Sequence, residues 1–198
     1  MAMISVKEAS KIIDDHISIV PREKVSINVA EGRVLAQDIV ASFPQPRFNN
    51  SAMDGFAVRA SDTKGASKNS PVALKMVGVV SAGSPGDIVV DTGQCVQCMT
   101  GAPIPQGADA IVMVEYSSGY ESGPEVQMYT EVQAGQHIRR VGEEIQSGEV
   151  LVNNGSCITT AELGTLATFG YKDFRVYRKP RLAIFATGDE LVEPGNDL

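Results

Sequence analysis

Tryptophan is absent from this chain of 198 residues, and cysteine and histidine are scarce, with three and two copies. Three cysteines cannot all pair with one another, which argues against a secreted disulfide framework and favours a reducing compartment. No run approaches the roughly 20 apolar residues that a membrane span needs, and residues 1–8 lack the layout of a secretory signal. We therefore expect a cytoplasmic protein that does not cross a membrane.

Basic residues are also few, with 17 lysines and arginines against 24 aspartates and glutamates, which gives a net charge of −7. This balance disfavours nonspecific binding to nucleic acid or to an anionic membrane. An anionic ligand would need a local basic patch or a bound cation. Hydrophobic residues (43%) and charged residues (21%) occur at the levels of a folded globular protein.

One pair of cysteines, in Cys95-Val96-Gln97-Cys98, has the spacing of half a zinc site or of a redox pair. The pair lies in a predicted strand, where residues i and i+3 point to opposite faces, so one sulfur would face the core and the other away from it. No second Cys-x-x-Cys exists, and His16 and His137 are remote in sequence. Since a closed zinc site needs four ligands, a metal or redox role is disfavoured.

The expected fold is α+β with more than one domain. Capping boxes predict a helix after Ser5 and another after Thr159, because a glutamate follows each of them by three residues. Between the helices, five short segments separated by turn residues favour a small β-barrel or sandwich. These segments are Phe56–Arg59, Val72–Val80, Gln94–Met99, Ala110–Val114 and Val126–Val132.

The predicted domains are a mixed helix and strand domain in two parts, residues 1–46 and 146–178, and an inserted β-rich domain, residues 47–145. Residues 179–198 differ, because Leu182 to Ala186 is a continuous apolar run, which is typical of a strand covered on both faces in a parallel sheet. Such a strand has nothing to pair with inside 198 residues. We therefore expect that the natural protein continues, or that the chain is an excised fragment.

Three loops carry residues that could do chemistry, and each has two readings. Asp54-Gly55 is either an ordinary turn or a carboxylate held on rigid backbone for a hard cation such as Mg²⁺. Thr100-Gly101-Ala102-Pro103 is either a Gly/Pro loop or a backbone cradle for an oxyanion. The loop His137 to Glu144 joins two arginines with two glutamates, as in a surface salt-bridge loop or in a site for a metal-bridged anion.

Taken in order, four segments of the chain resemble the MoeA family, whose animal relatives include the E domain of gephyrin. They are Asn50-Ser51-Ala52-Met53-Asp54-Gly55-Phe56-Ala57-Val58-Arg59, Met99-Thr100-Gly101-Ala102-Pro103-Ile104-Pro105-Gln106-Gly107-Ala108-Asp109-Ala110, Ile138-Arg139-Arg140-Val141-Gly142-Glu143 and Ala186-Thr187-Gly188-Asp189-Glu190-Leu191. The resemblance covers essentially the whole chain. It implies a first domain with an inserted β-rich domain, followed by the opening strand of an α/β molybdopterin-binding domain.

The function that the resemblance implies is molybdenum-cofactor biosynthesis by a homodimeric molybdopterin molybdenumtransferase. The enzyme inserts molybdate into adenylylated molybdopterin, releases AMP and uses Mg²⁺. Contact with the molybdopterin adenylyltransferase is also expected. The later motifs of the family are absent from these 198 residues, so we expect the chain alone to be inactive.

By resemblance, the catalytic residues are Asp54, Thr100, Glu144 and Glu190, and Asp54 and Glu190 hold the metal. Glu144 departs from the aspartate that is common at this place in bacterial relatives. Cofactor-binding residues are expected in all four segments, namely Ser51, Gly101, Arg139, Arg140, Thr187, Gly188 and Asp189.

Two other functions remain open at this stage. One is a dimeric scaffold or receptor-binding module of the gephyrin type, in which the dimer surface matters more than the acidic loops. The other is a catalytically dead paralogue, which the retention of Asp54, Thr100 and Glu190 together disfavours.

Overall fold

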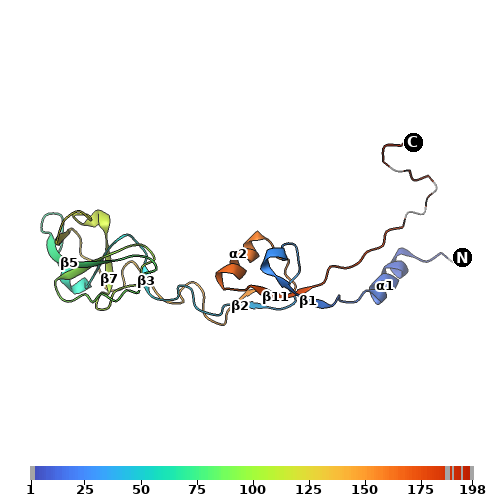
Figure 1. Ribbon diagram of the computed structural model, residues 1–198, viewed down its shortest axis with the longest axis horizontal. Coiled ribbons are helices and arrows are strands. Elements are labelled where there is room, and N and C mark those ends of the chain that lie inside the picture. The colour runs from blue at the N-terminus through green and yellow to red at the C-terminus, as the bar shows by residue number, and fades with distance from the viewer. Residues whose placement is uncertain (1–2, 186–187, 189, 193, 197–198) are drawn as a thin grey trace. The chain divides into compact units, whose positions relative to one another are not determined.

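The structure is a computed structural model that describes residues 3–185, 188, 190–192 and 194–196. The chain forms two compact units (Figure 1). Unit 1 consists of Met1–Ile39 and Val150–Leu198, and unit 2 consists of Val40–Glu149. The segment between the two parts of unit 1 is thus a separate compact body, whereas the sequence-based boundaries of the insertion were 47 and 145.

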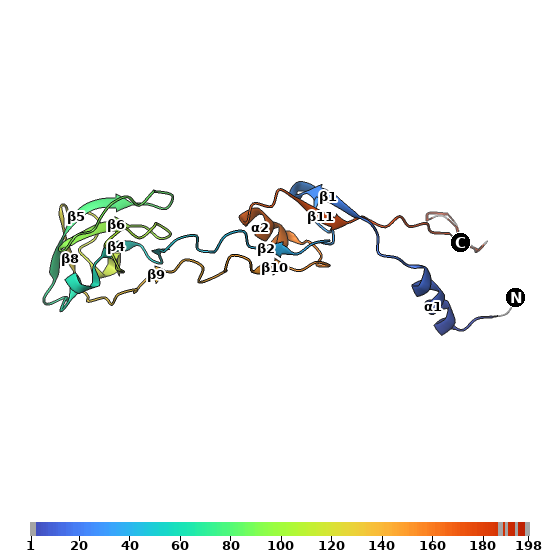
Figure 2. The same ribbon diagram turned by 90° about the horizontal axis from the view of Figure 1, so that it is seen from below.

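Unit 2 is built on a curled five-stranded sheet with the order β7-β4-β6-β5-β8. Figure 2 labels β4, β6, β5 and β8 of this sheet, and Figure 1 labels β7. Neighbouring strands are antiparallel, except that β5 and β6 are parallel. Every predicted strand segment of this region overlaps one of the five strands. They are β4 (Gly55–Val58), β5 (Val72–Val80), β6 (Gln94–Cys98), β7 (Ala110–Met113) and β8 (Glu125–Met128).

Four short elements complete unit 2. The two-residue strands β3 (Asn50–Ser51) and β9 (Ile138–Arg139) form an antiparallel pair. Single 3-10 turns cover Ala60–Thr63 and Val114–Tyr116. The β3–β9 pair matters for function because it joins two of the four family-like segments.

Both faces of the sheet in unit 2 are covered by apolar side chains. On β4, Phe56 and Val58 belong to one buried cluster, whereas Ala57 belongs to another. Cys95 and Cys98 of β6 divide in the same way, and both are buried. The expectation that one sulfur faces away from the core was therefore wrong, because the alternation of a strand does not reveal whether its second face is covered.

Gly55 at the start of β4 allows an unusually close approach of β7. A Cβ atom on Gly55 would overlap the carbonyl oxygen of Val112 and would lie 2.9 Å from the Cα of Met113. Gly55 is itself paired with Met113 on one side and with Cys98 on the other. The residue before Gly55, Asp54, is therefore held next to the first residue of β4, a tightly packed interior strand.

Unit 1 has a small core between two pairs of strands and one helix. Strand β1 (Arg22–Ser26) pairs with β11 (Asp173–Tyr177), and β2 (Ile39–Val40) pairs with β10 (Val150–Val152). A 3-10 turn covers Ile27–Val29. The buried residues of this core are Ala30, Leu35, Ile39, Ile158, Leu166, Phe174 and Val176.

The two predicted capping boxes are confirmed. Ser5 and Glu8 begin α1 (Val6–His16), and Thr159 and Glu162 begin α2 (Thr160–Thr168). The apolar side chains of α1 are not buried, whereas α2 buries Leu166. Among the residues described, no helix combines the length and the apolar character that crossing a bilayer requires.

The predicted strand from Leu182 to Ala186 is not formed in the part that the structure describes. Residues 182–185 have no regular secondary structure, and the side chains of Leu182, Ile184 and Phe185 are exposed. Ala186 lies outside the described residues. A strand needs a partner for its backbone N–H and C=O groups, and none of the described strands pairs with residues 182–185.

Candidate active site

Two of the predicted catalytic residues meet directly in unit 2. Asp54 precedes β4 and Thr100 follows β6, and these strands are antiparallel neighbours, so both residues lie at the same end of the sheet. The Oδ1 atom of Asp54 accepts hydrogen bonds from the backbone N–H and from the hydroxyl of Thr100, each at 2.7 Å. The two motifs, 46 residues apart in sequence, therefore form one constellation.

The contacts with Thr100 favour the charged form of Asp54. The backbone N–H of Thr100 and then its hydroxyl lower the pKa of the Asp54 carboxyl, because both donors bind the carboxylate more strongly than the acid. The residue is exposed, and its second oxygen is not used in these two bonds. Asp54 is therefore an ionised carboxylate with one oxygen fixed and one available to a ligand.

Ser51 and Gly101 hold the two motifs together through their backbones. The N–H of Gly101 donates to the carbonyl of Ser51 at 2.9 Å, and the N–H of Ser51 donates to the carbonyl of Ala102 at 3.0 Å. Gly101 has a φ of 80°, in the left-handed region that favours glycine. The Ser51 side chain is buried, and its hydroxyl donates to the carbonyl of Met53 at 2.5 Å. In this structure Ser51 stabilises the loop that presents Asp54.

The third family-like segment lies beside the first. Arg139 is the register partner of Asn50, and the N–H of Ala52 donates to the carbonyl of His137 at 2.9 Å. His137 has a φ of 58°, which is uncommon for a residue other than glycine. The structure thus places the backbone of Arg139 next to the segment that leads to Asp54.

The charged side chains of this third segment do not gather into one cluster. Arg140 lines a separate pocket, and the N–H of Arg140 donates to the carboxylate of Glu143 at 2.6 Å. Glu144 is exposed, and its backbone N–H donates to the carbonyl of Gln45 at 3.0 Å. The roles predicted for Arg139, Arg140 and Glu144 stay predictions.

The fourth segment belongs to the other unit. Gly188 and Glu190 are described as part of unit 1, where the N–H of Leu191 donates to the carbonyl of Gly188 at 3.2 Å. Thr187 and Asp189 lie outside the described residues. Within the described part of the chain, no group of three or more histidine, cysteine, aspartate or glutamate side chains could hold a metal ion.

Tyr120 is a neighbour of the site that sequence reasoning missed. Its ring packs on Phe56 with the centroids 5.5 Å apart, and its hydroxyl is buried without a hydrogen-bond partner among the described residues. Burial raises the pKa of Tyr120, and the negative charges of Asp54 and Glu115 raise it further. No sequence signal distinguishes Tyr120, since it lies in a turn of serines and glycines.

Comparison with known proteins shows which family carries the motifs of Asp54 and Thr100. A family model described as "MoeA N-terminal region (domain I and II)" matches residues 4–170. The chain belongs to the MoeA family. The resemblance inferred from the four segments is thereby confirmed, and the arrangement of Asp54 and Thr100 can be considered as that of a MoeA protein.

Several relatives are similar over nearly the whole chain. The molybdopterin molybdenumtransferase of Staphylococcus epidermidis is 39% identical over 201 residues, which cover 98% of this chain and 46% of the relative. Molybdopterin molybdenumtransferase 2 of Mycobacterium tuberculosis is 37% identical over 196 residues, which cover 99% and 48%. The chain therefore spans about half the length of the curated relatives that it matches.

A solved structure supports the same assignment. The crystal structure of the molybdopterin biosynthesis moeA protein from Pyrococcus horikoshii OT3 matches with a TM-score of 0.86 and 36% sequence identity. The match covers 98% of this chain and 52% of that protein. The α+β fold with a curled β-rich unit therefore fits the N-terminal region of a MoeA protein.

Proposed function

We propose that the chain is the N-terminal part of a molybdopterin molybdenumtransferase, which inserts molybdate into adenylylated molybdopterin and releases AMP. The observation that carries the proposal is the Asp54 carboxylate, which Thr100 fixes through two hydrogen bonds of 2.7 Å. The names of the relatives from Staphylococcus epidermidis and Mycobacterium tuberculosis support the reaction. The gephyrin-type scaffold has no comparable observation in its favour.

The proposed task of Asp54 and Thr100 is electrostatic. Molybdate and the adenylylated substrate are both anions, so a cation has to reduce their repulsion, and carboxylates have to hold that cation. The free oxygen of Asp54 is a hard, ionised ligand of the kind that Mg²⁺ prefers. Bound Mg²⁺ would neutralise charge on the phosphoanhydride, and Thr100 would keep Asp54 ionised and correctly oriented.

The remaining residues would act around this carboxylate. Arg139 lies beside the segment of Asp54 and would contact an anionic oxygen of the substrate. Glu144 and Glu190 would supply further carboxylates, and the residues around Gly188 would bind the cofactor. By resemblance to the MoeA family, we also propose that the active form is a homodimer in which Asp54 and Thr100 serve the cofactor of the partner subunit. Contact with the molybdopterin adenylyltransferase, which would hand over the substrate, is part of this proposal.

The decisive experiment joins this chain to the C-terminal half of the Staphylococcus epidermidis relative and measures AMP release and molybdenum incorporation. Asp54→Asn keeps the acceptor for Thr100 but removes the charge, so both readouts should fall at least 100-fold. Asp62→Asn is the matched control, since the Asp62 carboxylate also accepts a backbone N–H, that of Gly93 at 2.8 Å, outside the site. Full activity of the Asp54 variant would refute the assignment.

A further inference from the structure

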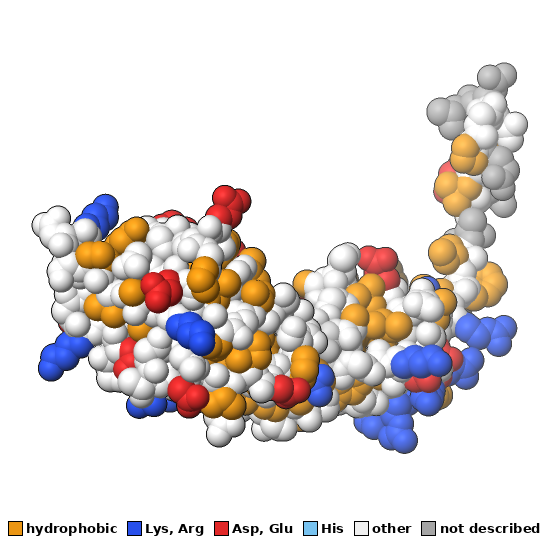
Figure 3. Space-filling model, turned by 60° about the vertical axis from the view of Figure 1, so that its left-hand side comes forward, with side chains coloured by type: hydrophobic (Ala, Val, Ile, Leu, Met, Phe, Trp, Pro, Cys, Tyr) orange, Lys and Arg blue, Asp and Glu red, His pale blue; other side chains and the backbone are white. Residues whose placement is uncertain are grey.

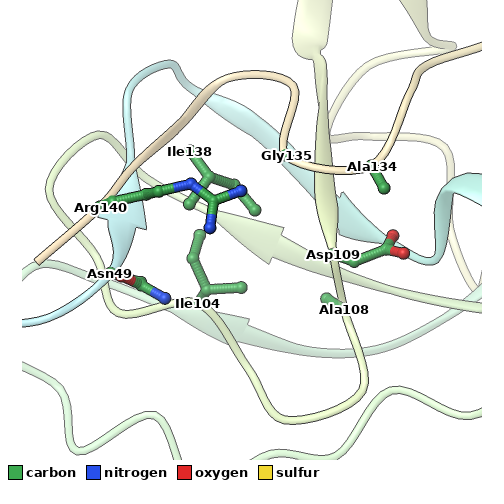
Figure 4. Close-up of a pocket in the computed structure, with 8 residues that line it drawn as sticks. All are labelled: Asn49, Ile104, Ala108, Asp109, Ala134, Gly135, Ile138 and Arg140. Carbon is green, nitrogen blue, oxygen red and sulfur yellow. The ribbon is translucent and has the colours of Figure 1, made fainter.

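Unit 2 has a hollow that is distinct from the site of Asp54 and Thr100. It has a volume of about 280 Å³, and neither of those two residues lines it (Figure 4). Its walls come from the segment before β3, from the loop before β7, and from β9 with the residues on either side of it. The lining residues are Asn49, Ile104, Ala108, Asp109, Ala134, Gly135, Ile138 and Arg140.

One end of the hollow presents hydrogen-bond donors. Among the described residues, no ion pair joins the guanidinium of Arg140 to a carboxylate, and Glu143 accepts a hydrogen bond from the backbone N–H of Arg140. The side-chain oxygen of Asn49 accepts the N–H of Val141 at 2.9 Å, which leaves the amide nitrogen of Asn49 to donate. Figure 4 shows the guanidinium and this amide nitrogen on the same side of the hollow.

The backbone around Arg140 makes room for the guanidinium. Gly135 has a φ of 85°, and a Cβ atom there would lie 3.2 Å from a terminal nitrogen of Arg140. His137, between the two residues, has a left-handed backbone although it is not glycine. Such strained residues persist only where the surrounding structure fixes them, and they concentrate at ligand sites.

The floor and the far end of the hollow have a different character. The floor of the hollow is aliphatic, because it consists of Ile104, Ala108 and Ile138. These side chains pack against the buried cluster that contains Ala57 and Cys98. At the far end, the Asp109 carboxylate accepts the N–H of Ala60 at 2.6 Å. One end therefore suits a single anionic group, the floor suits a nonpolar or planar body, and the Asp109 end disfavours a second anion.

We propose that this hollow binds an oxyanion of the phosphate type, with Arg140 and Asn49 as donors and the aliphatic floor beneath the group that carries the oxyanion. A guanidinium fork and an amide N–H are the donors that proteins use for such oxygens. The oxyanion could be a free inorganic ion or the phosphoryl group of a phosphate monoester. The proposal goes beyond the proposed function because it uses neither Asp54 nor Thr100, although Arg140 is also among the cofactor-binding residues that the family resemblance implies.

The test is a titration of the ¹⁵N-labelled 198-residue chain, followed through its amide NMR signals, with inorganic phosphate and with phenyl phosphate. We expect saturable shifts at Ala108, Gly135 and Ile138, and about tenfold tighter binding of phenyl phosphate if the monoester is the natural class. Equal binding of the two probes would assign the hollow to the free ion. Arg140→Gln should weaken binding at least tenfold, whereas Lys75→Gln, the same charge change at an exposed site on β5, should not.

Three results would overturn the proposal. The first is the lack of saturable shifts at millimolar concentrations of either probe. The second is equal binding by the Arg140 variant. The third is a set of shifts confined to unit 1, where Arg22, Lys24 and Arg175 form an exposed basic surface on β1 and β11. Figure 3 shows lysine and arginine side chains gathered on that unit, so unit 1 is the natural competitor for anions.

Discussion

Replacing Gly55 by alanine should destabilise unit 2 far more than the same change at Gly78. Both glycines lie in strands of the five-stranded sheet, and neither has a positive φ. A Cβ on Gly55 would overlap the carbonyl oxygen of Val112, which belongs to the backbone of β7. A Cβ on Gly78 would instead lie 2.5 Å from the terminal methyl of Ile88, at the flexible end of a side chain.

The expected change in the free energy of unfolding depends on which atoms have to move to accommodate the added methyl group. The backbone of β7 cannot yield without breaking its pairing with β4, and overpacking of this kind costs about 1–3 kcal/mol or more. At Gly78, the Ile88 side chain can rotate away from the added methyl group. In both variants, alanine also reduces the conformational entropy of the unfolded chain, which stabilises the folded state by about 0.4–1 kcal/mol. We therefore expect a loss of about 2 kcal/mol or more for Gly55→Ala and a change within about 1 kcal/mol for Gly78→Ala.

Urea unfolding followed by far-UV circular dichroism measures both values, since the chain has no tryptophan to report by fluorescence. Amide signals of β4 and β7 should be followed as well, because the two units need not unfold together. Gly78→Ala is the control for the general effect of adding a methyl group to this sheet. If Gly55→Ala unfolds at the same urea concentration as the unchanged chain, the close approach of β4 and β7 is not the reason for glycine at this position.

The remaining predictions concern single polar groups. Thr100→Val removes the hydroxyl donor but keeps the backbone donor, so the pKa of Asp54 should rise part of the way to its ordinary value, as measured by ¹³C NMR of the carboxyl. The lowered pKa of Asp54 stabilises the folded state above about pH 4, and this contribution is lost as pH falls through the pKa of the folded state. The stability of the Thr100 variant should therefore depend less on acid. An unchanged pKa of Asp54 would contradict the hydrogen bond from the Thr100 hydroxyl. Tyr120→Phe removes a buried hydroxyl that has no hydrogen-bond partner in the described part of the chain, so the free energy of unfolding should stay the same or rise, and a loss above about 1 kcal/mol would mean that a partner exists. One thiol, that of the exposed Cys157, should react rapidly with a thiol reagent, because burial raises the pKa of Cys95 to about 12 and of Cys98 to about 11; fast reaction of all three would contradict their burial.

The sequence predicts best what depends on neighbouring residues. The capping boxes at Ser5 and Thr159 are local hydrogen-bond patterns, and both helices begin where these patterns place them. The strands of unit 2 were located by their apolar runs and by the turns between them. The apolar run at Leu182 has the local character of a strand, but a strand requires a partner elsewhere, and residues 182–185 pair with none of the described strands, as the lack of a partner within the 198 residues led us to expect.

Contacts between distant segments could not be derived from periodicity. Nothing in the order of apolar residues gives the register in which Gly55 faces Cys98, and the meeting of Asp54 with Thr100 depends on that register. The family resemblance supplied the pairing of the two motifs, but not its geometry. Tyr120 was missed for the same reason, since its place beside Phe56 follows from the path of a turn that carries no signal of its own.

The strand order explains why three family-like segments converge in unit 2. The antiparallel pairing of β4 with β6 brings the residue before one strand, Asp54, to the end of the other, where Thr100 follows. The pairing of β3 with β9 then attaches Arg139 to the segment that leads to Asp54. A shift of one residue in the β4–β6 register would separate Asp54 from both donors of Thr100 and would exchange the two faces of β4. The close packing at Gly55 opposes such a shift, so the glycine that follows Asp54 preserves the geometry of the site by fixing the position of the strand.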